Sequence, residues 1–129
     1  MKLDNLKSTM PMAKRERLFA LGPKIENHDQ FPKRINVQLA EPASRRNVRA
    51  LIWERGAGHT LASGTSSCAV AAACYDRGLV DGAVAIEMEG GTLEVEVAQD
   101  LSIVMKGPVE EVYAGTLSPD LRTRLDAME

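Results

Sequence analysis

The sequence lacks any marked excess of one charge and any long hydrophobic run. It has 16 basic and 18 acidic residues among 129, so nothing in the charge balance favours nucleic acid or an anionic membrane as a partner. No apolar run approaches the roughly 20 residues that span a bilayer, and no apolar core follows the lysine near the start. We therefore expect a cytoplasmic protein whose partners are small molecules or other proteins.

Cysteine is also scarce. The two cysteines, Cys68 and Cys74, stand six residues apart in one expected helix, which points them in different directions and fits neither a disulfide nor a zinc site. Both are better interpreted as small buried hydrophobic residues than as nucleophiles. No pattern in the sequence indicates a metal, a flavin, pyridoxal phosphate or a nucleotide cofactor.

The residues that are present predict one compact domain, because 44% hydrophobic content over 129 residues is enough for a sizeable core. Apolar and polar residues alternate in several short segments, as in strands joined by tight turns. The expected strands are 34–39, 47–55, 83–88, 92–98, 101–105 and 109–117. The segment 47–55 is apolar on both faces, as expected of a strand covered on both sides. Helices are expected at 12–21, stopped by Gly22-Pro23, and after Ser118 as an N-cap.

A further helix follows the stretch Ser63-Gly64-Thr65-Ser66-Ser67. Five apolar residues fill the interval between Cys68 and Cys74, so this helix has no polar face and should be buried on every side. Only a sheet curled around it would remove that surface from water. The predicted fold class is α+β: an antiparallel or mixed sheet around one central apolar helix, with a short C-terminal helix.

The start of the apolar helix can bind an anion. Backbone N–H groups in a first helical turn lack intrahelical partners and carry the positive end of the dipole, so residues 63–67 could receive a carboxylate or a phosphate. Gly64 allows close approach. The alternative is that Ser63, Thr65 or Ser66 merely caps the helix, and the pattern alone does not decide between the two.

Several ordered motifs resemble diaminopimelate epimerases. The C-terminal signature of that family resembles Glu54-Arg55-Gly56-Ala57-Gly58, Thr60, Ala62-Ser63-Gly64-Thr65 and Cys68-Ala69. Segments upstream and downstream are also similar, namely Gly22 to His28, Phe31-Pro32, Arg34 to Val37, Gly90-Gly91 with Leu93, and Met105-Lys106-Gly107-Pro108 to Gly115. The resemblance runs from about Leu18 to Leu117. It divides the chain into an N-terminal extension, residues 1–17, and one epimerase-like C-terminal domain, residues 18–129.

The resemblance implies a cofactor-independent isomerase of lysine and cell-wall biosynthesis, built from two pseudo-symmetric halves of which this chain is one. In that family two cysteines, one from each half, exchange the substrate α-proton. The implied catalytic positions are Ser63 and Glu54. The implied substrate-binding residues are Asn36 and Arg55, for the distal amino acid end, and Gly64 and Thr65, for the proximal carboxylate. Without the resemblance, Glu54 and Arg55 would be interpreted as an ion pair at a strand end, worth little by itself.

The chain departs from the family pattern at two of these positions. Ser63 stands where the family has its catalytic cysteine, and an aliphatic hydroxyl is a poor base without an adjacent activating group. His59 replaces the usual glutamate, although a histidine there could titrate near neutrality. His28 is expected to be an ordinary polar surface residue, and Glu94 and Glu96 to lie on the solvent face of a strand.

Three hypotheses follow for the function. The chain could be an epimerase subunit that gains its other half from a separate polypeptide, which predicts an apolar surface that a partner covers. It could form a homodimer that binds an amino acid without converting it, as a small-molecule sensor would. It could also be an isolated half with no independent function.

Overall fold

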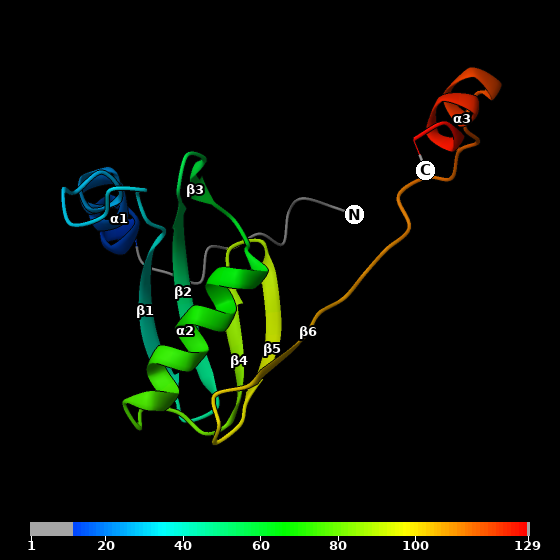
Figure 1. Ribbon diagram of the computed structural model, residues 1–129. Helices are drawn as coiled ribbons and strands as arrows, with labels where there is room; N and C mark the ends of the chain where they lie inside the picture. Colours follow the sequence, from blue (N-terminus) through cyan, green and yellow to red (C-terminus); the bar gives the residue numbers. More distant parts are fainter. Residues whose placement is uncertain (1–11, 129) are drawn as a thin grey trace.

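The computed structural model describes residues 12–128 and shows one sheet with helices packed on both of its faces (Figure 1). The sheet order is β1-β2-β4-β5-β6, and β3 pairs with β2 outside this path. The elements in chain order are α1 (Met12–Glu26), β1 (Val37–Ser44), β2 (Asn47–Glu54), β3 (Gly58–Thr60), α2 (Gly64–Asp76), β4 (Ala83–Met88), β5 (Gly91–Val97), β6 (Ile103–Lys106) and α3 (Pro119–Asp126).

The sheet is mixed, as predicted. Neighbouring strands run antiparallel except for β2 and β4, which pair in parallel with Asn47 opposite Ala85 and Arg49 opposite Glu87. Parallel strands need a crossover connection, and α2 supplies it. Gly78 lies one residue beyond the C-cap of α2 and allows the helix to stop: it has a φ of +67°, and its N–H donates to Tyr75 O at 2.8 Å.

Strand β2 lies at the centre of the packing. Val48, Ala50 and Ile52 pack on one face in the cluster formed with α2, β4 and β5. Leu51 faces the other way and packs with Leu18 of α1, which is fully buried. Because a strand alternates its side chains, a strand covered on both sides must be apolar on both, as the sequence predicts for this segment.

The α+β class is confirmed, but the complete burial expected for α2 is wrong. Val70, Ala71 and Cys74 are buried, whereas Thr65, Ala69 and Ala73 are exposed at four-residue intervals along one side of the helix. The reason is geometric: the sheet covers one side of α2, and within the described residues no element packs on the other (Figure 1). One face of an apolar helix is therefore left in solvent.

Helix α1 is longer than predicted and continues through Gly22 and Pro23 to Glu26. A Cβ added at Gly22 would lie 2.6 Å from Trp53 Cδ2. Gly22 therefore lets α1 approach β2 closely and does not end the helix. The prediction that Gly22-Pro23 ends the helix was wrong, because Gly22 is needed for close packing against Trp53.

The remaining differences lie at short or exposed segments. Strand β3 was not predicted, whereas residues 109–117, predicted as a strand, are extended without strand pairing and carry the exposed side chains of Val109, Val112 and Tyr113. Helix α3 forms as predicted with Ser118 at its N-cap, yet none of its residues is buried. It lies away from the sheet at the end of the extended segment (Figure 1).

Among the helices of residues 12–128, none is both long enough and apolar enough to cross a membrane.

The contact between Gly22 and Trp53 predicts an unusual response to alanine. In an exposed helix interior, Gly→Ala stabilises by up to about 1 kcal/mol; here the added methyl group meets an indole ring, so Gly22→Ala should destabilise the fold by about 1–3 kcal/mol. Urea unfolding followed by circular dichroism measures this. Gly78→Ala is the control, since it meets no atom within 4 Å and should cost only the backbone strain of about 1–2 kcal/mol. Stabilisation by Gly22→Ala would contradict the close contact.

Candidate functional site

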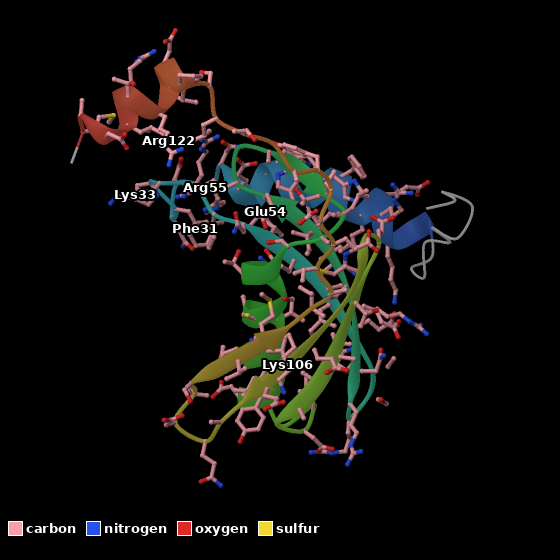
Figure 2. All side chains as sticks on the ribbon, turned by 90° about the vertical axis from the view of Figure 1, so that its right-hand side faces the viewer. Phe31, Lys33, Glu54, Arg55, Lys106 and Arg122 are labelled. Carbon is pink, nitrogen blue, oxygen red and sulfur yellow. The ribbon has the colours of Figure 1, made fainter. Side chains whose placement is uncertain are left out.

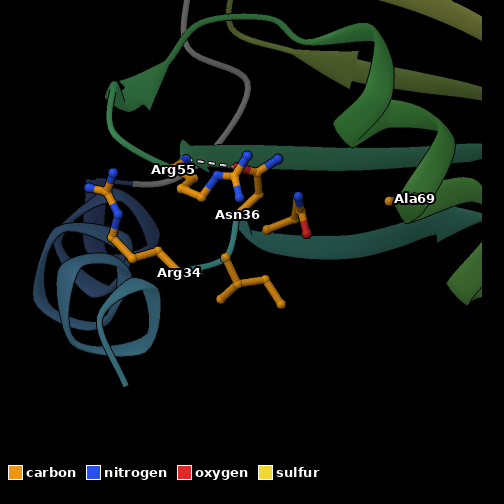
Figure 3. Close-up of a pocket in the computed structure, with 6 residues that line it drawn as sticks. Arg34, Asn36, Arg55 and Ala69 are labelled. Carbon is orange, nitrogen blue, oxygen red and sulfur yellow. Dashed lines mark hydrogen bonds between the residues drawn. The ribbon is translucent and has the colours of Figure 1, made fainter. Parts of the chain in front are cut away.

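Asn36 and Arg55 are brought together by the pairing of β1 with β2. Asn36 immediately precedes β1 and Arg55 immediately follows β2, and Val37 is the register partner of Trp53. The side-chain Oδ1 of Asn36 accepts a hydrogen bond from the backbone N–H of Arg55 at 2.7 Å (Figure 3). The guanidinium of Arg55 also donates to the carbonyl oxygen of Lys33 at 3.1 Å. The structure thus places two predicted site residues in direct contact.

A pocket of about 380 Å³ opens beside this pair (Figure 3). Its lining residues include two arginines and two residues with side-chain amides but no acidic residue, so its charge suits a carboxylate ligand. The guanidinium of Arg34 is directed to Glu26, which leaves that of Arg55 for a ligand. The lining residues are Arg34, Ile35, Asn36, Gln38, Arg55 and Ala69. Ala69 brings the exposed face of α2 to the edge of the pocket.

Ser63 caps helix α2. Its backbone is extended, with φ −150°, and its Oγ accepts from the backbone N–H of Ser66 at 3.3 Å. The capping alternative is therefore correct for this side chain. In the part of the chain that the structure describes, the N–H groups of Gly64 and Thr65 have no acceptor. The first turn still offers donors to an anion, as such turns do.

Ser63 and Gly64 border a second hollow, of about 250 Å³, between the start of α2 and the β4–β5 turn. Its other lining residues are Ala62, Met88, Gly90, Gly91, Thr92, Leu93 and Pro108. The structure therefore brings the predicted residues together in two pairs, Asn36 with Arg55 and Ser63 with Gly64. Glu54 and Thr65 line neither hollow.

Glu54 connects the two regions through partly buried hydrogen bonds. Its Oε1 accepts from the hydroxyl of Ser66 at 2.9 Å, and that hydroxyl accepts from the amide of Gln38 at 3.0 Å. Ser66 is 1% exposed. Glu54 and Arg55 lie at the same end of the sheet (Figure 2), but their charged groups form no ion pair among those of the described residues. The carboxylate is directed toward α2.

The buried carboxylate of Glu26 holds the turn that carries Arg55. Glu26 is 6% exposed and lies at the end of α1. It accepts from Trp53 Nε1 at 2.7 Å, from the backbone N–H of Gly56 at 2.8 Å and from Arg34 at 3.3 Å. The hydrogen bonds from Trp53 and Gly56 hold the pKa of this carboxyl below its usual range, and the charge of Arg34 acts in the same direction.

The other candidates lie apart from these contacts. His59 pairs with Glu89 at 2.6 Å, and Glu89 also contacts Arg15 of α1 at 3.3 Å. His28 is exposed, as predicted. Cys74 is buried, which raises the pKa of its thiol, and Cys68 is half-buried. Both cysteines are free, and residues 12–128 contain no group of three or more His, Cys, Asp or Glu that could hold a metal ion.

Three residues that hold the site through hydrogen bonds were not predicted as site residues: Glu26, Gln38 and Ser66. Gln38 lies two residues after Asn36 and so on the same face of the strand. The alternation that predicts the strand could therefore have indicated that Gln38 lies beside Asn36. Ser66 stands one turn after Ser63, which placed it among the possible caps. Glu26 lies in the segment Gly22 to His28, where the resemblance implies no role for it, and only its tertiary partners show one.

The α+β domain thus has two groups that can bind carboxylates, the available N–H groups at the start of α2 and the guanidinium of Arg55, and they lie at two separate hollows. The family profile for diaminopimelate epimerase matches residues 3–112. The diaminopimelate epimerase of Stutzerimonas stutzeri is 46% identical over 96 residues, which cover 74% of this chain and 35% of that protein. That of Rhodospirillum centenum is 42% identical over 104 residues, covering 81% and 36%. The chain belongs to the diaminopimelate epimerase family.

The match extends to a plant protein, since the chloroplastic diaminopimelate epimerase of Oryza sativa subsp. japonica is 42% identical over 101 residues, covering 78% of this chain and 28% of that protein. A solved structure of a PhzF-family phenazine biosynthesis protein from Bacillus anthracis aligns over 74% of this chain and 30% of its own, with a TM-score of 0.49 and 14% identity. The chain spans only about a third of the length of the curated relatives it matches.

The lowered pKa of Glu26 predicts a pH-dependent stability. A carboxyl whose pKa is depressed on folding stabilises the fold above its unfolded value, near 4.5, and this contribution is lost as pH falls through the folded value. Wild type should therefore lose thermal stability below about pH 4.5 more steeply than Glu26→Gln, which should be less stable at pH 7. Melting temperatures between pH 7 and pH 3 measure the difference.

The matched control is Glu16→Gln, which alters an exposed carboxylate on the same helix. Its melting curve should follow that of wild type at every pH. Identical pH profiles for wild type and Glu26→Gln would mean that the Glu26 carboxylate is not held as the structure shows.

Proposed function

We propose that this chain is the C-terminal substrate-binding domain of a cofactor-independent amino acid epimerase resembling diaminopimelate epimerase. It would serve the interconversion of LL- and meso-diaminopimelate in lysine and peptidoglycan biosynthesis, in the cytoplasm, and be inactive alone. The observation that carries the proposal is the contact between Asn36 and Arg55 at the pocket beside α2. In this proposal residues 18–129 form the domain and residues 1–17 an extension.

In the proposed complex Arg55 and Asn36 hold the distal amino acid end of the ligand. A planar guanidinium can bind a carboxylate with two parallel hydrogen bonds, and the position of Arg55 is supported by Asn36 and Lys33. The N–H groups of Gly64 and Thr65 receive the proximal carboxylate. These elements need no metal or organic cofactor to bind a zwitterionic substrate.

Proton transfer is a separate requirement that Ser63 does not meet. An alcohol is not ionised to a useful extent near neutral pH unless a base adjoins it. The nearest polar partners of Ser63 Oγ are the N–H of Ser66, at 3.3 Å, and the hydroxyl of Thr65, at 3.4 Å. Glu54, the proposed assisting carboxylate, accepts instead from Ser66. We therefore propose binding without epimerisation by this chain alone.

Two apolar surfaces support an assembly as part of the proposal. One is the exposed face of α2, and the other is the extended segment 107–118, in which Val109 is 94% and Val112 90% exposed. Exposed apolar surface of this extent is typical of interaction sites. A complementary N-terminal half in a separate polypeptide is the proposed partner. The same surfaces favour, as a second candidate, a homodimeric amino-acid-binding domain without catalysis.

Proton NMR of diaminopimelate in D2O with the purified chain tests the proposed binding. We expect broadening of the ligand signals without loss of the α-proton signal, and Arg55→Ala should abolish the broadening because it removes the carboxylate partner. Arg77→Ala, which changes an exposed arginine at the end of α2, should behave as wild type. Exchange that depends on the chain would show an enzyme in its own right. Silence on both counts would contradict ligand binding by the isolated chain.

Sedimentation analysis distinguishes the two assemblies. A chain that awaits a complementary half should remain monomeric across a hundredfold range of concentration, whereas a homodimer should dissociate on dilution. Val112→Asp should raise the dissociation constant of a homodimer by tenfold or more, because it places a charge in apolar surface that the dimer would bury. Glu110→Asp, in the same segment, is the control. A dimer that is insensitive to Val112→Asp would exclude the extended segment from the interface.

A further inference from the structure

We infer that Gln38 is a specificity-determining residue of the Asn36–Arg55 pocket, where its side-chain carbonyl accepts a hydrogen bond from the ammonium group of a bound amino acid. The inference rests on the proposed function, and it assigns a role to a residue outside the sites carried over from the family. It follows from the direction of the hydrogen bonds that surround two amide side chains. An amide has one accepting and one donating end, so a neighbour that fixes one end determines what the other presents.

The orientation of Gln38 is fixed by Glu54 through Ser66. An ionised carboxylate can only accept, so the single hydroxyl proton of Ser66 is donated to Glu54 Oε1, 2.9 Å away. The Ser66 oxygen must then accept in its contact with Gln38, 3.0 Å away. Gln38 therefore directs its NH2 group to Ser66. Ser66 is 1% exposed, so its hydroxyl has little access to water as an alternative partner.

The carbonyl end of Gln38 is left for the pocket. Within residues 12–128 no group donates to its Oε1, and Gln38 lines the pocket together with Asn36 and Arg55. Among the six residues that line the pocket, Gln38 is the side chain that offers such an acceptor, since the Asn36 carbonyl is already bonded. This acceptor can take a hydrogen bond from an ammonium group, whereas the donors of Asn36 and Arg55 suit the carboxylate of the same ligand.

Asn36 is fixed in the opposite sense. A backbone N–H can only donate, so the contact between Arg55 N and Asn36, at 2.7 Å, uses the Asn36 oxygen. The NH2 group of Asn36 is then available to a ligand carboxylate, beside the guanidinium of Arg55. The pocket thus presents donors from Asn36 and Arg55 and an acceptor from Gln38, which is the complement of an α-carboxylate with its adjacent α-ammonium.

The orientation can be tested without a ligand. In wild type the side-chain amide protons of Gln38 should show a contact with the Ser66 side chain and slowed exchange in 15N-edited NMR spectra. Ser66→Ala removes the acceptor, so the Gln38 amide signals should shift and exchange faster, whereas those of exposed Gln99 should not change. Gln38 amide signals that are unaffected by Ser66→Ala would overturn the fixed orientation.

The specificity can be tested with two ligands that differ only in their ammonium groups. Gln38→Met keeps the length of the side chain and removes the acceptor, so it should weaken binding of meso-diaminopimelate by about tenfold or more, the usual range for a hydrogen bond to a charged group. Binding of pimelate, the same dicarboxylate without ammonium groups, should change less than twofold. Titration calorimetry or NMR titration measures both, and Gln99→Met is the control.

The outcomes separate the two claims. Equal losses for both ligands, or no loss for diaminopimelate, would overturn the role of Gln38 and leave the proposed function intact. Failure of wild type to bind either ligand would overturn the proposed function and the specificity that rests on it. In that case the ligand-free amide spectra would still report how Gln38 is held.

Discussion

The site depends on the hydrogen bonds that the buried carboxylate of Glu26 accepts. This carboxylate joins the end of α1, the indole of Trp53 on β2 and the backbone of Gly56 in the turn after that strand. A negative charge at a helix C-terminus is unfavourable, and burial adds a desolvation cost. The donors from Trp53, Gly56 and Arg34 offset both effects. Because the turn is held at Gly56 and, through Asn36, at Arg55, the guanidinium is carried by a fixed backbone.

Strand β2 connects this turn to the rest of the molecule. Its two apolar faces pack against α1 and α2, so the helix that carries Glu26 and the helix that offers its N-terminus are positioned by the same eight residues. Burial of Leu51 on one side and Ile52 on the other, each contributing about 1.5–3 kcal/mol, fixes the strand in both directions. The backbone at the end of the strand is then fixed, which places the Glu54 carboxylate within hydrogen-bond distance of Ser66. The site is a consequence of how one strand is shared by two helices.

Much of this could be predicted from the sequence, and the failures have physical causes. Short strand patterns bounded by turns predicted β1, β4, β5 and β6 within a few residues, and an apolar run predicted β2. The Ser63 and Ser118 caps are local signals that hold in the structure. Gly22 was misread because its role is a contact with Trp53, 31 positions along the chain. Complete burial of α2 failed because composition indicates that a surface is apolar, but not whether anything covers it. Asn36 and Arg55 came from the family resemblance, whereas their contact, and the parts played by Glu26 and Ser66, depend on tertiary geometry that no local pattern contains.

The proposed ligand binding and proton transfer make different physical demands, and the described residues suit the first better than the second. Binding an amino acid needs donors and acceptors held in fixed directions, and the bonds from Arg55 N to Asn36 and from Gln38 to Ser66 supply them without any change of protonation. Removing an α-proton needs a group that can be ionised and an acceptor beside it. Ser63 is occupied as a helix cap, and the nearby carboxylate of Glu54 is engaged by Ser66. In the proposed function, a serine at position 63 leaves binding without proton transfer, because the Asn36–Arg55 pocket does not include that residue.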